Sequence, residues 1–327
     1  MRKQKETRPK AKKAGYKITN WSEYNQSLIE RGKIYLWIPY SVLDDWYYKG
    51  PEQKGAQYVY SDSCIELCLT IKILFKLGYR QTQGFLESIF ESWGIDLRVP
   101  SYSEMCKRSS VIRIKKEKYK KKSREAGIQI STDSTGLKVY GEGEWKVRKH
   151  GWSKHRTWQK LHMAVNPEDK IIISNELTGN NIDDADVVEE LLKDINNIAS
   201  FIGDGAYDKN KVYELLESRK IKPIIPPRKN ARIKKHGNKK GKRFARDKNI
   251  RGIRKHGRKK WKQKIKYHKR SISETNMFRY KIIIGEKLKS RIIEKQKTES
   301  KIACKIINRM TKCGMPISIK INKNNAA

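Results

Sequence analysis

The feature that most constrains the fold is a change of hydrophobic pattern about a third of the way along the chain. Up to residue 112, apolar residues recur in long runs typical of helices. After residue 126, apolar and polar residues alternate around Ile128 and Leu161, and an apolar run follows at Ile171, which predicts three successive strands. Helix-like and strand-like segments then alternate as far as Pro226. This succession predicts an α/β fold with a mixed sheet and right-handed crossovers.

The same patterns divide the 327-residue chain, which is long enough for about two domains. The predicted parts are a basic flexible arm (1–17), a helical N-terminal domain (18–112), a basic linker (113–126), a mixed-sheet domain (127–316) with a basic insertion (228–266), and a tail (317–327).

Three helices are predicted in the N-terminal domain, at about 64–77, 79–93 and 101–110. Ser61 or Asp62 can cap the first helix, and Gly78 can end it. Cys64 and Cys68 are one helical turn apart, which indicates core packing. The second and third helices fit either a helix-turn-helix that enters DNA or an ordinary helical bundle.

The charge of the chain favours a polyanionic partner. Lys and Arg number 75 against 35 acidic residues, a formal charge of +40, which favours nucleic acid over an acidic membrane surface. No apolar run approaches the roughly 18 residues that a membrane helix needs, and the basic N-terminus lacks the apolar core of a signal peptide. Five scattered cysteines without a CxxC pair argue against zinc and favour reduced thiols in the cytoplasm.

The most basic segment lies between Arg228 and Arg270, with 22 Lys or Arg and the single acid Asp247. It shows almost no apolar periodicity, so we expect it to have no core of its own and to face DNA phosphates; the alternative is a solvated, disordered loop. Trp261 can stack on an unpaired base or, alternatively, anchor the insertion by packing. The residues expected to contact DNA are Arg80, Arg228, Lys229, Arg232, Arg246, Arg254, Arg258, Lys259, Lys260 and Trp261.

Three acidic residues are candidates for catalysis. Asp133 and Asp204 each end a strand-like run, and Glu274 lies in a helix-like segment. Carboxylates that converge from separate elements can hold divalent cations, and two such cations can bind both sides of a phosphodiester displacement. Each acid also has a simpler explanation, as an Asx-turn, a turn or helix cap, or a charged surface residue. We expect Asp208 to cap the following helix, which leaves Asp204 free.

Glu274 shares one helical stripe with three other polar residues. Tyr267, Arg270, Glu274 and Lys281 fall within an arc of roughly 60° on an ideal helix. Cations beside a carboxylate can hold phosphate oxygens while the carboxylate binds metal.

These residues stand in motifs that resemble the DDE-class transposases of bacterial insertion sequences, in the group founded on insertion sequence 5. The Tyr-x2-Arg-x3-Glu-x6-Lys spacing is that family's signature, and the resemblance covers about residues 20–316. The other matching stretches are 79–85, 100–103, 133–138, 143–145, 158–162, 203–208 and 225–231.

The resemblance implies an RNase H-like catalytic domain after a helical DNA-binding domain. It implies that Asp133, Asp204 and Glu274 bind Mg²⁺ or Mn²⁺, as two ions, and that Tyr267, Arg270 and Lys281 assist. The expected enzyme is a DNA transposase that binds terminal inverted repeats, cleaves the ends to expose a 3′-hydroxyl and joins them to target DNA.

The expected partners are double-stranded DNA and further copies of the chain, as a homodimer or higher assembly, in the nucleoid of a prokaryotic cytoplasm. Two alternatives are a retired transposase kept for DNA binding alone and a structure-specific nuclease on the same fold. Joining of a 3′-hydroxyl end to target DNA separates the transposase from both alternatives.

Overall fold

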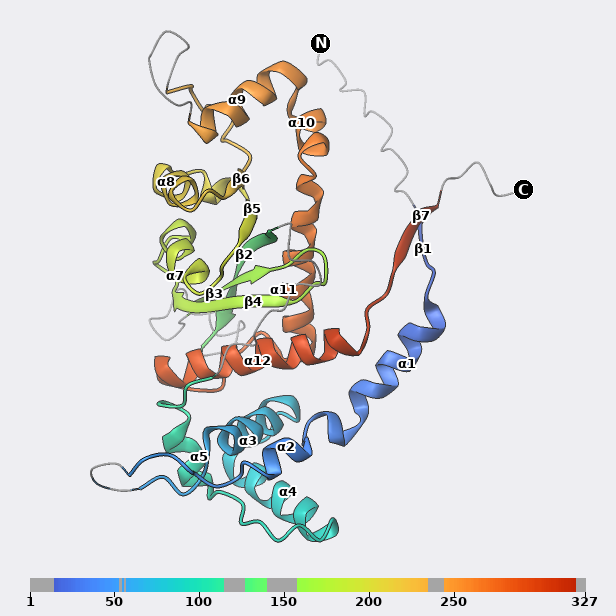
Figure 1. The fold of residues 1–327 in the computed structure, drawn as a ribbon, viewed down its shortest axis with the longest axis vertical. Coiled ribbons are helices and arrows are strands. Elements are labelled where there is room, and N and C mark those ends of the chain that lie inside the picture. The colour runs from blue at the N-terminus through green and yellow to red at the C-terminus, as the bar shows by residue number, and fades with distance from the viewer. Residues whose placement is uncertain are drawn as a thin grey trace, which may run out of the picture.

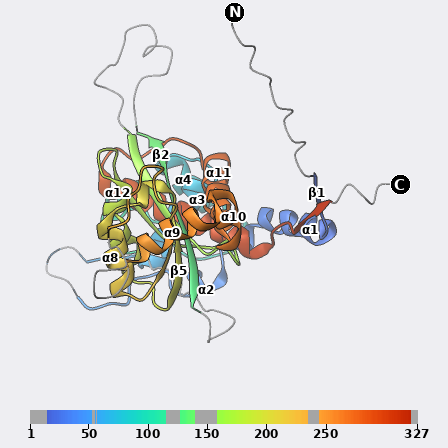
Figure 2. The same ribbon diagram turned by 90° about the horizontal axis from the view of Figure 1, so that it is seen from above.

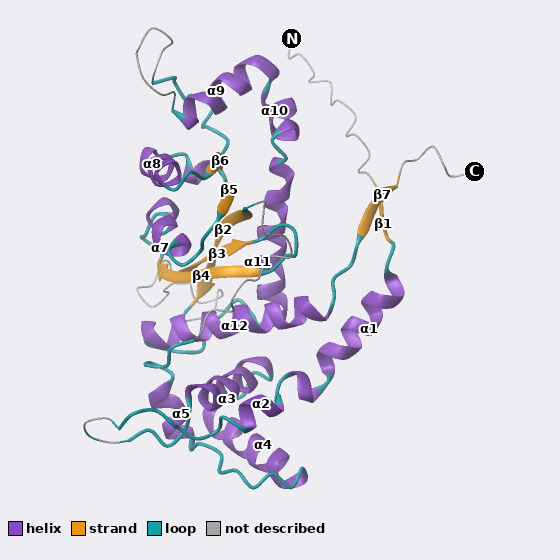
Figure 3. Ribbon diagram, viewed as in Figure 1, coloured by secondary structure: helices purple, strands orange, loops and turns teal. Residues whose placement is uncertain are grey.

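The computed structural model describes residues 15–52, 55, 57–114, 127–139, 158–234 and 244–321. These residues form a mixed α/β structure in which helices lie on both faces of one central sheet (Figure 3). Most of the predicted linker at 113–126, most of the predicted basic arm and the motif at 143–145 lie outside the described residues.

The central sheet has five strands. They are β2 (Ile128–Lys138), β3 (Trp158–Val165), β4 (Ile172–Gly179), β5 (Ile198–Ile202) and β6 (Lys222–Ile224). Their order is β4-β3-β2-β5-β6; β3 is antiparallel to both neighbours, whereas β5 and β6 run parallel to β2. This order and these directions are those of an RNase H-like fold. The predicted succession of three strands is confirmed.

Alternation along the strands builds a core on each face of the sheet. Ala164 packs with Ile130 and Phe201 against α7 (Val188–Leu192) and α8 (Asn210–Ser218). Leu161 and Met163 point the other way, into the core that includes α11 (Ser271–Ile283) and α12 (Ile293–Cys313). The helix predicted to follow Asp183 is shorter than expected, because a 3-10 turn, η2 (Asp184–Asp186), comes first.

The N-terminal region is helical, as predicted. Its helices are α1 (Trp21–Gly32), η1 (Ile34–Leu36), α2 (Tyr40–Leu43), α3 (Asp62–Leu74), α4 (Tyr79–Ser92) and α5 (Tyr102–Arg108). Ser61 caps α3 by accepting a hydrogen bond from the Cys64 N–H at 3.0 Å. Both Cys64 and Cys68 are buried free thiols, which confirms their predicted place in the core. The sequence patterns did not indicate α1 or α2.

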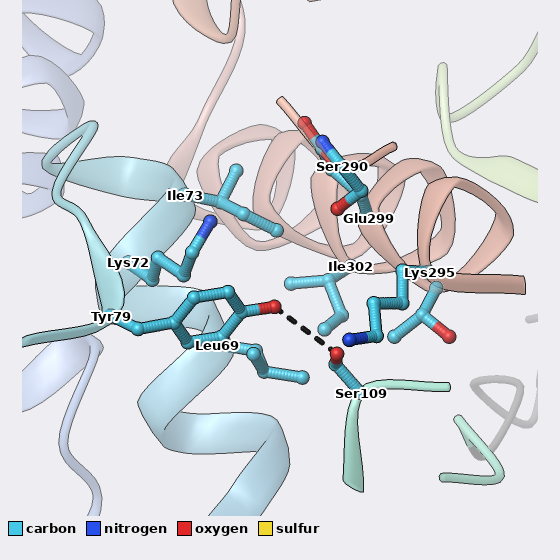
Figure 4. A pocket seen from close by; sticks show the side chains of 10 residues that line it. Leu69, Lys72, Ile73, Tyr79, Ser109, Ser290, Lys295, Glu299 and Ile302 are labelled. Carbon is cyan, nitrogen blue, oxygen red and sulfur yellow. Dashed lines mark hydrogen bonds between the residues drawn. The ribbon is translucent and has the colours of Figure 1, made fainter. Parts of the chain in front are cut away.

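Helix α12 joins the N-terminal helices to the sheet (Figure 1). On one side, Lys305 forms an ion pair with Glu66 of α3. On the other, the Asn308 side chain bonds both the N–H and the C=O of Ile172 in β4, at 2.8 and 2.7 Å. A narrow cavity at the joint contains the Lys72 ammonium, 4.6 Å from the centre of the Tyr79 ring (Figure 4). One continuous hydrophobic core therefore includes the N-terminal helices, α12 and one face of the sheet.

The basic insertion contains two helices, α9 (Ala245–His256) and α10 (Arg258–Lys264), contrary to the expectation that it has no core. Trp261 and Ile250 are both 4% exposed. A Cβ atom at Gly252 would lie 2.8 Å from the Trp261 ring, so glycine is needed for the two helices to pack this closely. Two buried apolar side chains are too few to produce a helical repeat of apolar residues in the sequence, although they pack at this pair of helices.

The two ends of the described chain pair with each other. Strand β1 (Gly15–Ile18) runs antiparallel to β7 (Ser318–Ile321), a pairing that the sequence patterns did not indicate. This ribbon stands away from the body beyond α1 in both views (Figures 1 and 2). In the part of the chain that is described, no helix is both long and apolar enough to span a membrane.

Candidate active site

Asp133 lies within β2, not at its end as the sequence indicated. Beyond Ser131, β2 loses its parallel partner β5, but it continues to pair with β3 as far as Lys138. Asp133 therefore stands two residues past the last pair with β5, where that side of the sheet opens. Its side chain points to the α11 face, as does that of Ser131, whose hydroxyl lies 3.0 Å from the Ser273 hydroxyl.

Asp204 follows the carboxyl end of β5, the neighbour of β2. Its carboxylate accepts a hydrogen bond from the Ala206 N–H at 2.8 Å and so caps the 3-10 turn η3 (Gly205–Tyr207). Gly203 precedes it because the Tyr207 ring packs against the backbone there: a Cβ atom would lie 2.8 Å from that ring.

Asp208 does not cap α8, so that expectation is wrong. The residue before α8 is Lys209, whose side chain makes no capping bond. The Asp208 carboxylate instead accepts bonds from Arg246 Nε and Nη2 at 2.8 and 3.0 Å and from the Arg228 N–H at 3.0 Å. Burial alone would raise the pKa of Asp208, but these bonds lower it below its ordinary value. Capping by Asp204 does not prevent it from acting as a ligand, since its other carboxylate oxygen has no hydrogen bond within the described residues.

Glu274 lies in the first turn of α11, and a 3-10 turn, η4 (Tyr267–Arg270), precedes that helix. The single helix predicted across this segment therefore changes its winding at Ser271. Tyr267 and Arg270 nevertheless stay on one side of the segment, because residues three apart lie directly above each other in a 3-10 turn. The Ser273 hydroxyl fixes the junction by donating to the Arg270 carbonyl at 2.7 Å.

Arg270 connects the helix to the sheet. Its Nη1 donates to Asp133 at 3.1 Å, and its Nη2 donates to Glu274. Burial raises the pKa of Asp133; Arg270 opposes that rise, whereas the charges of Asp204 and Glu274 add to it. Burial likewise raises the pKa of Tyr267, and the negative charges of all three carboxylates raise it further. The three predicted acids and two of their predicted helpers therefore lie within electrostatic reach of one another.

Lys281 lies apart from this group. It follows Glu274 by two helical turns, roughly 10 Å, and makes no ion pair within the described ranges.

Carboxylates are the oxygen donors that Mg²⁺ and Mn²⁺ prefer, so the chemistry of the three acids suits a divalent ion. Within the described residues, however, no three acidic, His or Cys side chains are close enough to hold one. The Arg270 guanidinium lies between two of the carboxylates. It must shift before they can share an ion.

A second polar group, which the sequence analysis missed, supports Asp133 from the opposite face of the sheet. Asp184 accepts bonds from the Ser134 hydroxyl at 2.9 Å and from Lys160 Nζ at 3.1 Å, and lies 3.8 Å from His162 Nδ1. His162 is fully buried, and burial lowers its pKa to about 4 although Asp184 acts in the opposite direction. The period-two pattern of β3 could have indicated that His162 points inward.

The residues expected to bind DNA fall into two groups. Trp261 is buried between α9 and α10, so the anchoring alternative is confirmed and its ring cannot stack on a base. Arg246 forms an ion pair with Asp208, and Arg258 donates to the Pro227 carbonyl at 2.7 Å. Both guanidinium groups therefore make contacts within the fold. The remaining candidates are exposed: Arg80, Arg228, Lys229, Arg232, Arg254, Lys259 and Lys260.

The RNase H-like sheet places the three acids within electrostatic reach of one another at the open side of β2, an arrangement whose chemistry suits phosphoryl transfer. Two family profiles, both described as a transposase DDE domain, match residues 29–142 and 124–308. The second covers more than half of the chain, and the chain belongs to this DDE transposase family. It is a DNA transposase, as the motifs predicted, and this family uses divalent metal ions.

One solved structure that resembles the chain is a piggyBac transposase synaptic complex with hairpin DNA, determined by cryo-EM. The identity is 11%, the TM-score is 0.37, and the match covers 90% of this chain and 76% of that one.

Proposed function

We propose that the protein binds the terminal inverted repeats of an insertion sequence, cleaves the ends to expose a 3′-hydroxyl and joins them to target DNA. The observation that supports this most strongly is that Asp133 and Glu274 both bond Arg270 and that Asp204, from a third element, lies within electrostatic reach of Asp133. A strand interior, a strand end and a helix seldom bring three acids together unless a cation or a reacting group requires them.

Asp133, Asp204 and Glu274 are proposed to hold Mg²⁺ or Mn²⁺, as two ions. Such ions stabilise charge on a phosphodiester and lower the pKa of bound water. Arg270, once displaced from Asp133, is placed to contact a phosphate oxygen, and Tyr267 above it positions the same group. Lys281 would contact DNA further along the helix. These roles concern placement of charge; the proposal includes no covalent link to the protein.

The proposed DNA surface consists of the exposed cations of the insertion together with Arg80 on α4. Their main contribution would be non-specific affinity with a steep dependence on salt. Transposition joins two ends, so the proposal includes a homodimer or higher assembly in the nucleoid of a prokaryotic cell.

The test uses the DNA that flanks the gene as substrate, with cleavage and joining measured separately in Mg²⁺. Asp133→Asn, Asp204→Asn and Glu274→Gln are each expected to lower end cleavage at least about a hundredfold while duplex binding persists. Asp186→Asn is the matched control, because Asp186 pairs with Lys211 and lies outside the site. Unchanged cleavage in all three variants would refute the triad.

The two alternatives predict different products. A protein kept for DNA binding alone would bind the ends without cutting them. A structure-specific nuclease would release a 3′-hydroxyl end without joining it to target DNA.

A further inference from the structure

A cavity of about 270 Å³ lies beside the candidate active site, on the same face of the sheet. Its floor includes Gln129, Ser200 and Lys222, which are direct neighbours across β2, β5 and β6. Gln129 and Asp133 are an even number of residues apart on β2, so they point to the same face. The opposite wall is the segment 264–269, which runs from the end of α10 into η4 and stops one residue before Arg270. We call this space the lysine cavity.

The lysine cavity is lined by cations and by no acid. Lys264 at the end of α10, Lys266 after it and Lys269 of η4 line the cavity together with Lys222 on the floor. None of the ten lining residues is Asp or Glu. Lys269 donates to the Gln129 side chain at 2.6 Å. Within the described residues, the other three lysines have no ion-pair partner. Four ammonium groups around one space repel one another unless an anion lies between them.

A buried hydroxyl on the floor is a second, independent sign of a ligand. Ser200 is 4% exposed, and its Oγ has no hydrogen-bond partner among the described residues. Buried polar groups are nearly always bonded, so an unpaired one requires a reason. A hydroxyl at the base of a space rimmed by ammonium groups matches the needs of a phosphate, which has several strong acceptor oxygens.

The position of the cavity relates it to the reacting phosphodiester. Asp133 follows Gln129 by four residue steps on β2, about 13 Å of strand. One strand of duplex DNA advances about 3.4 Å per nucleotide, so this distance corresponds to about four nucleotides. We propose that the lysine cavity binds a backbone phosphate of the DNA strand that is cut, about four nucleotides from the cleaved bond. This assignment rests on the proposed function, because it takes that strand as the ligand.

The test measures binding of the full chain, without divalent ions, to labelled duplexes that carry the flanking DNA end. Each duplex contains one uncharged methylphosphonate at a different position of the cleaved strand. For the wild type, we expect affinity to fall about three- to tenfold when the neutral linkage lies about four nucleotides from the cleavage point. The variant Lys264→Gln/Lys266→Gln should bind the unmodified duplex more weakly by a similar factor and should not respond to that linkage.

Two further variants separate the cavity from the general positive field. Lys259→Gln/Lys260→Gln removes the same charge from exposed lysines of α10 that do not line the cavity, and it should keep the response to position. Ser200→Ala should weaken binding of the unmodified duplex about threefold without lowering the melting temperature, because its hydroxyl has no partner to lose.

The proposal is overturned if no position near four nucleotides responds in the wild type, or if the response survives in Lys264→Gln/Lys266→Gln. Since no cleavage is involved, failure of the lysine cavity is distinguishable from failure of the active site. If the protein cuts DNA ends normally but its affinity does not depend on the position of the methylphosphonate, only the proposal for the lysine cavity is wrong.

Discussion

Arg270 sets the charge balance of the candidate site. It bonds Asp133 and Glu274 at once, so two carboxylates that would otherwise repel each other share one internal cation. Its guanidinium is only partly exposed, which strengthens both contacts relative to a surface pair. A divalent ion at the same carboxylates would compete with Arg270 for their oxygens.

This competition predicts a specific effect of replacing Arg270. In Arg270→Gln, Asp133 loses its neighbouring cation, so we expect its pKa to rise further and the free energy of unfolding to fall by about 1–2 kcal/mol without divalent ions. Mg²⁺ should then stabilise the variant more than the wild type, because no guanidinium has to be displaced. Thermal unfolding with and without Mg²⁺ measures this stabilisation, and Lys281→Gln is the control. Equal stabilisation by Mg²⁺ of the wild type, Arg270→Gln and Lys281→Gln would contradict the predicted competition.

His162 should make the free energy of unfolding depend on pH. Its pKa is about 4 in the folded protein and about 6.5 when unfolded, so between these values the unfolded chain binds more protons. Stability should therefore fall as pH decreases from about 6.5 to about 4, by about 3 kcal/mol in total. Urea unfolding across this range should show a flatter profile for His162→Asn than for the wild type. His268 is exposed, and His268→Asn should leave the pH dependence of the unfolding free energy unchanged. If His162→Asn showed the same pH dependence as the wild type, His162 would not be its cause.

Helix α9 is attached to the sheet domain through a buried ion pair. Asp208, whose side chain is fully buried, is bonded twice by Arg246 and once by the Arg228 N–H. Replacing Arg246 would leave a buried carboxylate without its cation, which is costly.

We therefore expect Arg246→Met to lower the free energy of unfolding by about 3 kcal/mol. Arg254→Met, which removes an exposed cation from the same helix, should change it by less than about 0.5 kcal/mol. Chemical denaturation compares the two. Equal effects would mean that Arg246 contributes only to the general charge of the insertion.

Local pattern predicted the elements that carry many apolar residues. The sheet strands and α3 were predicted because alternation or dense apolar runs persist along them. The insertion helices were missed, since Ile250 and Trp261 are the only buried apolar side chains in them, and Trp261 packs against Gly252 of the other helix. Strands β1 and β7 were missed because four exposed residues, paired from opposite ends of the chain, leave no local signal.

The same limit applies to the candidate site. Arg270 and Glu274 were predictable as neighbours because helical spacing fixes them within one segment. The electrostatic proximity of Asp133 to Asp204 agrees with the family resemblance of their motifs, which are distant in the sequence. Asp208 was misassigned because its partner Arg246 lies 38 residues further on, and no local rule relates the two.

At the level of the whole molecule, α12 holds the two halves of the fold together. It contacts α3 through Lys305, β4 through Asn308, and the N-terminal region again through Arg309, whose Nη1 donates to the Leu36 carbonyl at 3.1 Å. Its buried side chains belong to the one core that also includes Trp37.

Removing core volume from α12 should therefore weaken both halves together. We expect Ile306→Ala to lower the free energy of unfolding by about 2–5 kcal/mol. Hydrogen exchange read by mass spectrometry should show amides of α3 and β4 losing protection by the same amount. Ile319→Ala, in the exposed β7, should change neither segment. Loss of protection in α3 alone would mean that the N-terminal helices form a separate domain.

The late position of α12 in the chain has a consequence for synthesis. Helix α3 ends at Leu74, but the helix that completes its core begins at Ile293. At about 5–20 residues per second, a ribosome needs roughly ten to forty seconds to add the residues between them. During that time the apolar faces of the N-terminal helices remain uncovered, so the nascent protein should depend on chaperones more than its finished stability suggests.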